Sequence, residues 1–349
     1  MTTGNPGIDI AATGVNMRLL MRALLLFLCC GTTLAQDVHH YVFFAQERDR
    51  LTESSFIGLK ALEGAQVKYT WRELEPQRDA YDFSSVRHDL AVLRANGKKL
   101  FVQIQDVSFD TNIIIVPRYL LDDPQYHGGA DKQFDFQGDD ETHATAAGWV
   151  ARRWDPAVSD RFHRLLLALG RDFDGQVEGV NLAETAVEFG ASGRWFPKGF
   201  TPAIYRDAVL TNMIFLKRAF PNSVVMLYAN FMPGEWLPDD DHSYLRSVYQ
   251  RAKELKVGVA GPDLLPYKPG QMRHSYPLIR QCAGIVPTGI AVQWGNYQFK
   301  NPKTDRQVSV AELAGFATEY LKVNYVFWCT QEPFYSEKLL PWLAGRRSE

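Results

Sequence analysis

The sequence lacks the features that mark several large classes of protein. Its 349 residues carry a formal net charge of −2 with no Lys/Arg-rich block, so the attraction that nucleic-acid binding requires is missing and we expect no nucleic-acid partner. The 8 histidines are scattered, and no H-x-H, H-E-x-x-H or C-x-x-C spacing occurs, so we predict no catalytic metal. The chain also has no G-x-S-x-G motif and no glycine-rich nucleotide fingerprint, so a serine hydrolase is disfavoured and we expect no cofactor.

Cysteine is scarce. Of the 4 cysteines, Cys29 and Cys30 lie in an apolar N-terminal stretch, which leaves Cys282 and Cys329 for the rest of the chain. The two are able to form a disulfide in an oxidising compartment, but both have apolar surroundings, where free thiols behave as small hydrophobic groups. Both interpretations stay open.

The N-terminus has the tripartite pattern of a secretory signal. A segment with two arginines, Met17–Arg22, is followed by an apolar run and by small residues that end at Ala35. The run is too short to span a bilayer, and a lipoprotein anchor is disfavoured because its cysteines lie inside the run. We predict that residues 1–35 are a signal peptide and that translation starts at Met17. The mature chain, 36–349, is then secreted or periplasmic and has no membrane span.

Short apolar runs alternate with helical patterns along the mature chain. Hydrophobic residues make up 46% of the sequence and aromatic residues 13%, which is enough for one large core. The predicted strands are Tyr41–Ala45, Ala65–Thr70, Leu100–Gln105, Val177–Leu182, Val224–Ala229, Val257–Ala260, Gly289–Gln293 and Tyr325–Trp328. Eight such runs, each followed by a helical or loop-rich segment, predict a single-domain α/β (β/α)8 TIM barrel. A doubly wound sheet is the alternative.

The connections between these runs differ in length. Amphipathic patterns predict helices over 85–95, 159–171, 203–220, 243–256 and 310–321. The longest connection, 106–154, has no clear pattern, and we expect an irregular loop that shapes a cleft. The run Asp239–His242 is acidic enough to hold calcium, but its position favours capping the helix that begins near Ser243.

Several carboxylates follow the predicted strands. Because active sites of barrel enzymes lie at the carboxyl ends of the strands, Glu184 is the first candidate for a general acid, with Glu188 as its substitute. Glu332 follows the last strand and is the favoured second carboxylate, although Pro333 after it is typical of a local turn. Asp106 and Asp263 are further candidates. Each of these residues is also compatible with ordinary surface polarity.

Aromatic residues cluster at the same predicted ends. Flat rings there suit stacking on sugars, although core packing explains any one of them equally well. The tryptophans and tyrosines concerned are Trp71, Trp294, Trp328, Tyr228, Tyr267 and Tyr297. Among polar neighbours, Arg72, Asn181 and Gln293 are expected to hydrogen-bond hydroxyl groups or to orient the acid.

Two segments resemble a known superfamily. Trp71-Arg72-Glu73-Leu74-Glu75-Pro76, followed by Tyr81-Asp82-Phe83, is similar to the second-strand segment of the clan A (β/α)8 glycoside hydrolases. Trp154-Asp155-Pro156 and the approach to Glu184 resemble the fourth-strand segment. In that clan an Asn-Glu pair ends the fourth strand and its Glu is the acid/base, whereas Asn181 and Glu184 are two residues apart. The resemblance implies a retaining glycosidase with Glu184 as acid/base.

The seventh strand departs from that superfamily. Gln293-Trp294-Gly295 stands where the resemblance implies a nucleophilic glutamate, and a glutamine supplies no carboxylate to form a glycosyl ester. We therefore expect a glycoside hydrolase-like protein that acts on an oligo- or polysaccharide, with Glu184 as acid and Glu332 or Asp263 as second carboxylate. The alternative is a carbohydrate-binding pseudoenzyme on the same barrel.

Overall fold

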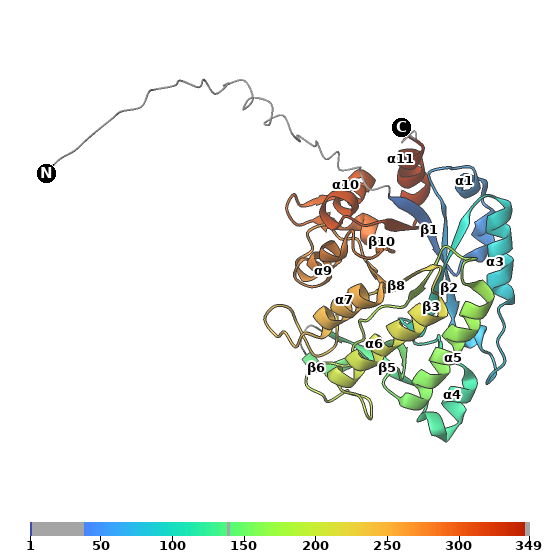
Figure 1. Cartoon of the computed structure of the whole chain (residues 1–349), viewed down its shortest axis with the longest axis vertical. Helices are drawn as coiled ribbons and strands as arrows, with labels where there is room; N and C mark the ends of the chain where they lie inside the picture. The colour runs from blue at the N-terminus through green and yellow to red at the C-terminus, as the bar shows by residue number, and fades with distance from the viewer. Residues whose placement is uncertain (2–37, 138–139, 346–349) are drawn as a thin grey trace. The chain divides into compact units, whose positions relative to one another are not determined.

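Eight parallel strands close into a barrel in the computed structural model, which describes residues 1, 38–137 and 140–345 (Figure 1). The barrel strands are β1 (His39–Ala45), β2 (Gly64–Thr70), β3 (Lys99–Gln105), β7 (Gly179–Leu182), β8 (Val224–Tyr228), β9 (Gly258–Gly261), β10 (Thr288–Val292) and β13 (Tyr325–Cys329). They follow chain order around the barrel, and β1 pairs with both β2 and β13. The (β/α)8 fold and all eight predicted strands are confirmed.

Helices cover the outside of the barrel (Figure 1). They are α1 (Ser54–Ile57), α2 (Trp71–Leu74), α3 (Ser84–Ala95), α4 (Arg118–Asp122), α5 (Pro156–Phe173), α6 (Pro202–Ala219), α7 (Tyr244–Leu255), α8 (Pro269–Arg273), α9 (Ser275–Cys282), α10 (Val310–Gly315) and α11 (Leu340–Gly345). Several begin at a capping side chain: Asp155 accepts from the Ala157 amide at 2.9 Å, and Ser309 forms a capping box with Glu312.

Large rings and glycines fill the lower part of the barrel interior. The Phe101 ring lies 6.1 Å from that of Tyr41 and 5.1 Å from that of Phe327, measured between centroids. Glycines on two strands make room for them. A Cβ at Gly179 would lie 2.4 Å from Phe101 Cζ, and one at Gly64 would lie 2.6 Å from Tyr41 Cε1. Branched aliphatic residues usually fill barrels. Here aromatic rings fill the space instead, and they fit because glycines on the neighbouring strands have no side chain.

The segment 106–154 is not irregular, and that prediction is wrong. It contains β4 (Val107–Ser108), β5 (Ala130–Gln137) and β6 (Asp140–Ala151), which form an antiparallel sheet in the order β4-β6-β5. The sheet is fixed to the loop after β7, because the Phe134 ring packs 4.8 Å from that of Trp195 and Glu141 accepts hydrogen bonds from Ala191 and Ser192. A second small ribbon joins β11 (Lys300–Asn301) and β12 (Arg306–Gln307).

The acidic run before α7 caps that helix. Asp241 Oδ1 accepts from the Ser243 amide at 2.8 Å, and its other oxygen accepts from Arg246 at 2.7 Å. Glu235, which the sequence did not single out, accepts from the amides of Tyr244 and Leu245. Carboxylates at this end oppose the partial positive charge of the helix N-terminus.

Two further sequence predictions concern the cysteines and the N-terminus. Cys282 and Cys329 are both buried and free, so the thiol interpretation holds and the disulfide does not form. The predicted signal peptide, residues 1–35, lies outside the described residues apart from Met1. Within the described part of the chain, no helix combines the length and apolar character needed to cross a membrane.

Candidate active site

Glu184 lies at the mouth of the barrel, two residues beyond the end of β7. Its carboxylate accepts a hydrogen bond of 2.7 Å from the Asn230 side chain, which follows β8. Burial raises the pKa of Glu184 to about 7, the Asn230 hydrogen bond opposes that rise, and the charge of Asp263 adds to it. Lys68 and Arg153 act in the lowering direction. A carboxyl group of this kind is protonated in a large fraction of molecules near neutral pH, as a general acid must be.

Asp263 is the second carboxylate of this mouth. It follows β9, and Asn296 Nδ2 donates to its Oδ1 at 3.0 Å. The same Asn296 accepts from the amides of Leu264 and Gln293, so one side chain holds the loops after β9 and β10 together. Burial raises the pKa of Asp263, and the Asn296 hydrogen bond opposes it. Because Asp263 also raises the pKa of Glu184, the two groups are within electrostatic reach of each other.

Lys68 is a cationic group that the sequence analysis did not single out. It lies near the end of β2, and its ammonium is 5.1 Å from the centroid of the Phe43 ring. Burial lowers the pKa of Lys68, and Glu184 opposes that change. A lysine inside a barrel strand was the available signal, since strands enclosed on both faces seldom carry a charge.

Neutral polar side chains form a floor below these groups. Gln66 donates to Asn181 at 2.8 Å, and Tyr228 donates to Gln66 at 3.0 Å, which links β2, β7 and β8 across the interior. All three are almost fully buried. Asn181 and Tyr228 therefore lie beneath the site, and neither presents an exposed surface to a sugar. For Tyr228 this is the core packing that the sequence left open as its alternative.

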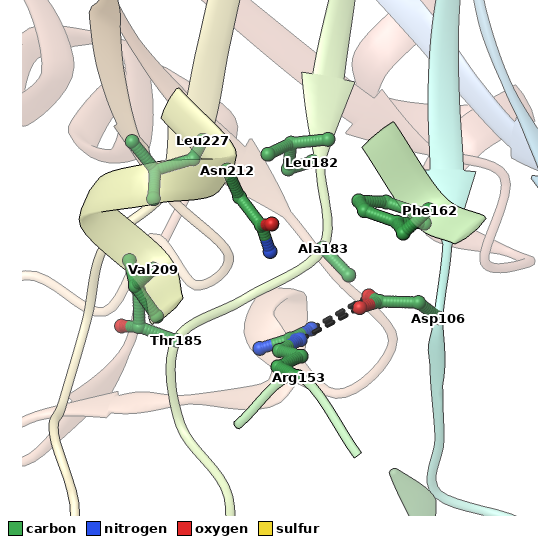
Figure 2. A pocket seen from close by; sticks show the side chains of 9 residues that line it. All are labelled: Asp106, Arg153, Phe162, Leu182, Ala183, Thr185, Val209, Asn212 and Leu227. Carbon is green, nitrogen blue, oxygen red and sulfur yellow. Dashed lines mark hydrogen bonds and ion pairs between the residues drawn. The ribbon is translucent and has the colours of Figure 1, made fainter. Parts of the chain in front are cut away.

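Asp106 does not face the mouth. It is buried and forms two charge-assisted hydrogen bonds with Arg153, of 2.7 and 2.6 Å (Figure 2). Arg153 also donates to the Glu184 backbone carbonyl at 3.0 Å and to the Tyr205 hydroxyl at 2.5 Å. The pair therefore fixes the backbone that carries Glu184, and both oxygens of the Asp106 carboxylate are engaged by Arg153.

A small cavity borders this pair. It is lined by Asp106, Arg153, Phe162, Leu182, Ala183, Thr185, Val209, Asn212 and Leu227 (Figure 2). Its volume of about 10 Å³ is close to what one water molecule needs. The cavity is too small for a sugar ring, and it lies between the barrel wall and the helices α5 and α6.

Two of the predicted stacking tryptophans are core residues. Trp71 is fully buried, packs 5.1 Å from the Phe162 ring and donates to Glu75 at 2.9 Å. Trp328 is also fully buried, with its indole nitrogen 3.0 Å from His40 Nδ1. Side chains alternate along a strand; on β13 Phe327 packs with the barrel rings and Trp328 packs on Trp342 of α11. Neither tryptophan offers a free face to a ligand.

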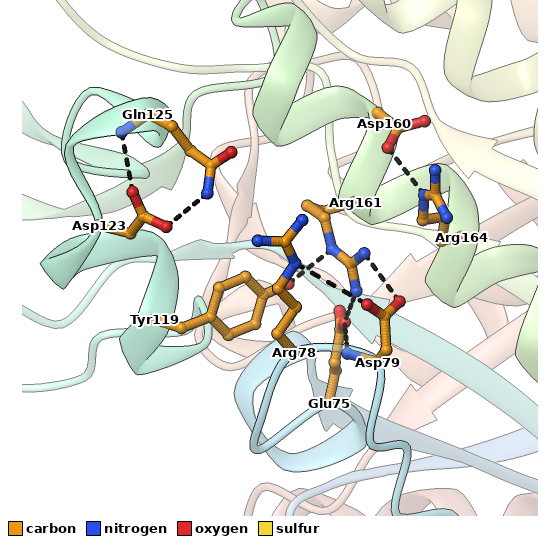
Figure 3. A network of polar contacts seen from close by, with 9 residues as sticks. All are labelled: Glu75, Arg78, Asp79, Tyr119, Asp123, Gln125, Asp160, Arg161 and Arg164. Carbon is orange, nitrogen blue, oxygen red and sulfur yellow. Dashed lines mark hydrogen bonds and ion pairs between the residues drawn. The ribbon is translucent and has the colours of Figure 1, made fainter.

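The segment after β2 is held by a buried ion pair. Arg161 of α5 binds Glu75, donates to Asp79 at 2.8 Å and donates to the Tyr119 hydroxyl at 3.0 Å (Figure 3). Glu75 is fully buried. This network joins α2, α4 and α5, so the Trp71–Pro76 segment that resembles the glycosidases acts here as structural support.

Other candidates are engaged away from the mouth. Glu332 is exposed, and its carboxylate accepts hydrogen bonds from the Ser336 amide and hydroxyl. This is the local capping role that Pro333 had indicated, so Glu332 is no longer the favoured candidate for the second carboxylate. Arg72 donates to the Val116 carbonyl at 2.8 Å. The Tyr267 ring is covered by Lys303, whose ammonium is 3.4 Å from its centroid.

Two further candidates, Tyr297 and Glu188, are also engaged by contacts within the protein. Tyr297 is buried and donates to the Cys329 carbonyl at 3.1 Å, so it is a core residue. Glu188 is exposed, and its carboxylate accepts from the Gly190 amide at 2.8 Å.

Gln293 and Trp294 follow β10 on the far side of the mouth from β2. The Gln293 side chain is partly exposed, and its backbone amide donates to Asn296. Trp294 is 69% exposed, which leaves its ring available for contact. Of the predicted site residues, the structure thus brings Glu184, Asp263, Gln293 and Trp294 to the strand ends.

Comparison with known proteins finds this architecture in solved structures. No protein-family model matches the chain, and no curated protein matches it in sequence. Among solved structures it is similar to the catalytic domain of β-amylase from Paenibacillus polymyxa, with 10% identity, a TM-score of 0.56, and coverage of 85% of this chain and 93% of that one.

Two xylanases are also similar. Xylanase 10B from Thermotoga petrophila, solved with xylobiose, has 12% identity, a TM-score of 0.49 and coverage of 84% and 83%. Xylanase XynB from Paenibacillus barcinonensis has 15% identity, a TM-score of 0.48 and coverage of 84% and 85%. The chain shares the (β/α)8 fold with the β-amylase domain, and the fold that the sequence resemblance implied is confirmed.

Proposed function

We propose that the chain is an exported glycoside hydrolase that cleaves a glycosidic bond of an oligo- or polysaccharide at the mouth of the barrel. The observation that carries this proposal is Glu184, a carboxyl group at the end of the fourth barrel strand whose pKa burial raises to about 7. Asn230 fixes its orientation, and Asp263 supplies a second carboxylate in electrostatic reach. Paired carboxylates with different environments are the arrangement that glycoside hydrolysis requires.

The two carboxylates have complementary roles. Glu184 donates its proton to the glycosidic oxygen as the bond from that oxygen to the anomeric carbon breaks. Asp263, the ionised partner, either removes a proton from the water that attacks the anomeric carbon or attacks that carbon itself. In the second case Glu184 then removes the proton from the water that releases the sugar. This restores the proton of Glu184 directly. When Asp263 acts as base, it gives its new proton to the solvent and Glu184 takes one up, so the net reaction in both routes is hydrolysis.

Other residues at the strand ends bind the sugar. Trp294 offers an exposed indole for stacking on a ring. Gln293 supplies a side-chain amide that is able to donate hydrogen bonds to sugar hydroxyl groups or accept them. The position that holds a charged nucleophile in the resembling enzymes would thus hold a neutral hydrogen-bonding group here. The absence of a carboxylate at Gln293 is compatible with hydrolysis because Asp263 comes from the neighbouring strand.

The test is glycan turnover by the exported chain on a panel of polysaccharides and of aryl glycosides in both anomeric forms. We expect Glu184→Gln and Asp263→Asn to lower kcat/KM by about 10²- to 10⁴-fold, the usual contribution of a general acid or base. Glu332→Gln is the matched control, and it should retain activity. The anomeric configuration of the first product, followed by NMR, then assigns Asp263 as base or as nucleophile.

A non-catalytic carbohydrate-binding protein is the second candidate, and Gln293 is the observation that favours it. This alternative predicts no turnover of any glycan. It also predicts that binding measured by calorimetry survives Glu184→Gln and is lost in Trp294→Ala. Turnover abolished by Glu184→Gln excludes it.

A further inference from the structure

Lys68 places a positively charged ammonium at the mouth, and the proposed hydrolysis gives this group no role. Gln66, two residues earlier on β2, reaches across the barrel to Asn181. Since side chains at positions i and i+2 of a strand share a face, Lys68 also points into the barrel, one step closer to the mouth. Its interaction with Glu184 places the ammonium on the same side as the acid.

The ammonium of Lys68 is desolvated without a partner in the protein. Within the described residues it has neither a hydrogen bond nor an ion pair, and its neighbour is the Phe43 ring. Lys98 provides the contrast inside the same chain. Lys98 is buried more deeply than the half-buried Lys68, and its ammonium donates to the carbonyls of Leu59 and Leu62 at 2.9 and 2.5 Å. Charges withdrawn from water are normally paired, and Lys68, which is half-buried and partly desolvated, has no such partner among the described residues.

The other cations near the mouth are already engaged or lie in solvent. Arg153 is neutralised by Asp106 through two hydrogen bonds. Lys268 is exposed and acts on Asp263 from the rim. A ligand that enters the mouth therefore meets one unpaired positive charge, which lies beside the acid and on an inner face of the barrel.

We propose that Lys68 binds an anionic substituent of the sugar next to the scissile bond, the carboxylate of a uronic acid or a sulfate ester. This inference rests on the proposed function, because it names the substrate class of the same site. The anion would supply the partner that Lys68 lacks, and a charge-assisted hydrogen bond between the two is stronger than a bond to a neutral hydroxyl.

The pairing also affects Glu184. The free Lys68 ammonium lowers the pKa of Glu184, whereas Asp263 raises it and Asn230 and Arg153 lower it. An anion bound to Lys68 cancels the first of these effects and leaves the others. The pKa of Glu184 in the complex is then higher with an anionic substrate than with a neutral one, and the acid stays protonated to higher pH.

The experiment compares aryl glucuronides with aryl glucosides of the same anomeric form. We expect the ratio of their kcat/KM values to fall by about 10- to 100-fold in Lys68→Met, the loss that one charge-assisted hydrogen bond represents. Lys68→Arg should keep most of the ratio. The ratio is unaffected by changes in Glu184 that act equally on both substrates. Lys268→Met is the control for the general positive potential of the mouth, and it should change the ratio by less than about twofold.

Two further readouts separate the outcomes. The basic limb of the kcat profile should lie at higher pH for the glucuronide than for the glucoside in the wild type. In Lys68→Met the limb for the glucoside should itself move to higher pH, because the cation that lowers the pKa of Glu184 is gone. Binding of glucuronate, glucose 6-sulfate and glucose to Glu184→Gln, followed by calorimetry, tests recognition without turnover and tells a carboxylate from a sulfate.

The results distinguish the two proposals. Turnover of neutral glycosides with an unchanged ratio in Lys68→Met overturns the inference and leaves the hydrolase intact. Binding of an anionic sugar that depends on Lys68, with no turnover of any glycoside, supports the inference and overturns the hydrolase. Equal binding of glucuronate and glucose by Glu184→Gln contradicts the role of Lys68.

Discussion

Ionising Glu184 should cost the folded protein stability, and the structure gives the size of that cost. Burial raises the pKa of this carboxyl group from the ordinary 4.5 to about 7. One pKa unit corresponds to about 1.4 kcal/mol, so the shift amounts to about 3 kcal/mol. Glu184→Gln keeps the shape of the side chain and an acceptor for Asn230 but carries no charge at any pH. The variant should therefore be more stable than the wild type in alkaline solution.

The sign follows from proton binding. Below pH 4.5 the carboxyl group is protonated in both states and the charge has no effect. Between pH 4.5 and 7 the unfolded chain loses the proton while the folded chain keeps it, so the stability of the wild type falls as pH rises. Above pH 7 the full penalty of about 3 kcal/mol is present.

The assay is urea unfolding of wild type and variant at pH 4.5, 6 and 8.5. The difference in the free energy of unfolding between Glu184→Gln and wild type should rise by about 3 kcal/mol over that range. Glu332→Gln, which removes an exposed carboxylate, is the control and should change stability by less than about 0.5 kcal/mol. A pH-independent difference for Glu184→Gln would refute the reasoning, because it would mean that the group is not desolvated.

Three further outcomes are expected. Asn230→Ala removes the hydrogen bond that lowers the pKa of Glu184, so the basic limb of the pH–rate profile should move to higher pH; a shift to lower pH contradicts the assignment. Arg153→Met leaves buried Asp106 unpaired and should destabilise the protein by about 3–5 kcal/mol in urea unfolding, with most of the loss recovered when Asp106→Leu is added. Gly179→Ala places a methyl group against Phe101 and should cost about 1–3 kcal/mol, less when combined with Phe101→Leu; equal losses in both backgrounds exclude the contact as the cause.

The sequence predicted the barrel because each strand is enclosed and therefore apolar along its length. That property is local, and it also located the mouth: the apolar run of β7 ends at Leu182, so Glu184 had to lie near the rim. The strands of segment 106–154 were not predicted, because antiparallel strands that face solvent on one side carry few continuous apolar residues.

The choice of Asp263 as the proposed second carboxylate depended on tertiary contacts. Glu332 and Asp263 both follow barrel strands, and nothing local separates them. The structure shows that Glu332 caps a turn through Ser336, whereas Asn296 holds Asp263 at the mouth. The direction of a side chain beyond a strand end is set by the loop backbone and by partners far along the chain, which periodicity does not report.

The sequence by itself determined the number of strands, their order and the placement of Glu184, because a strand buried on both faces appears in the sequence as a continuous run of apolar residues. Only the tertiary structure decided which side chains share the mouth. Trp71 and Trp328 turn into the core, while Lys68 and Asp263 converge with Glu184 from three different strands. Convergence across β2, β7 and β9 depends on the closure and register of the barrel, and these arise from pairing between segments that are far apart in the chain.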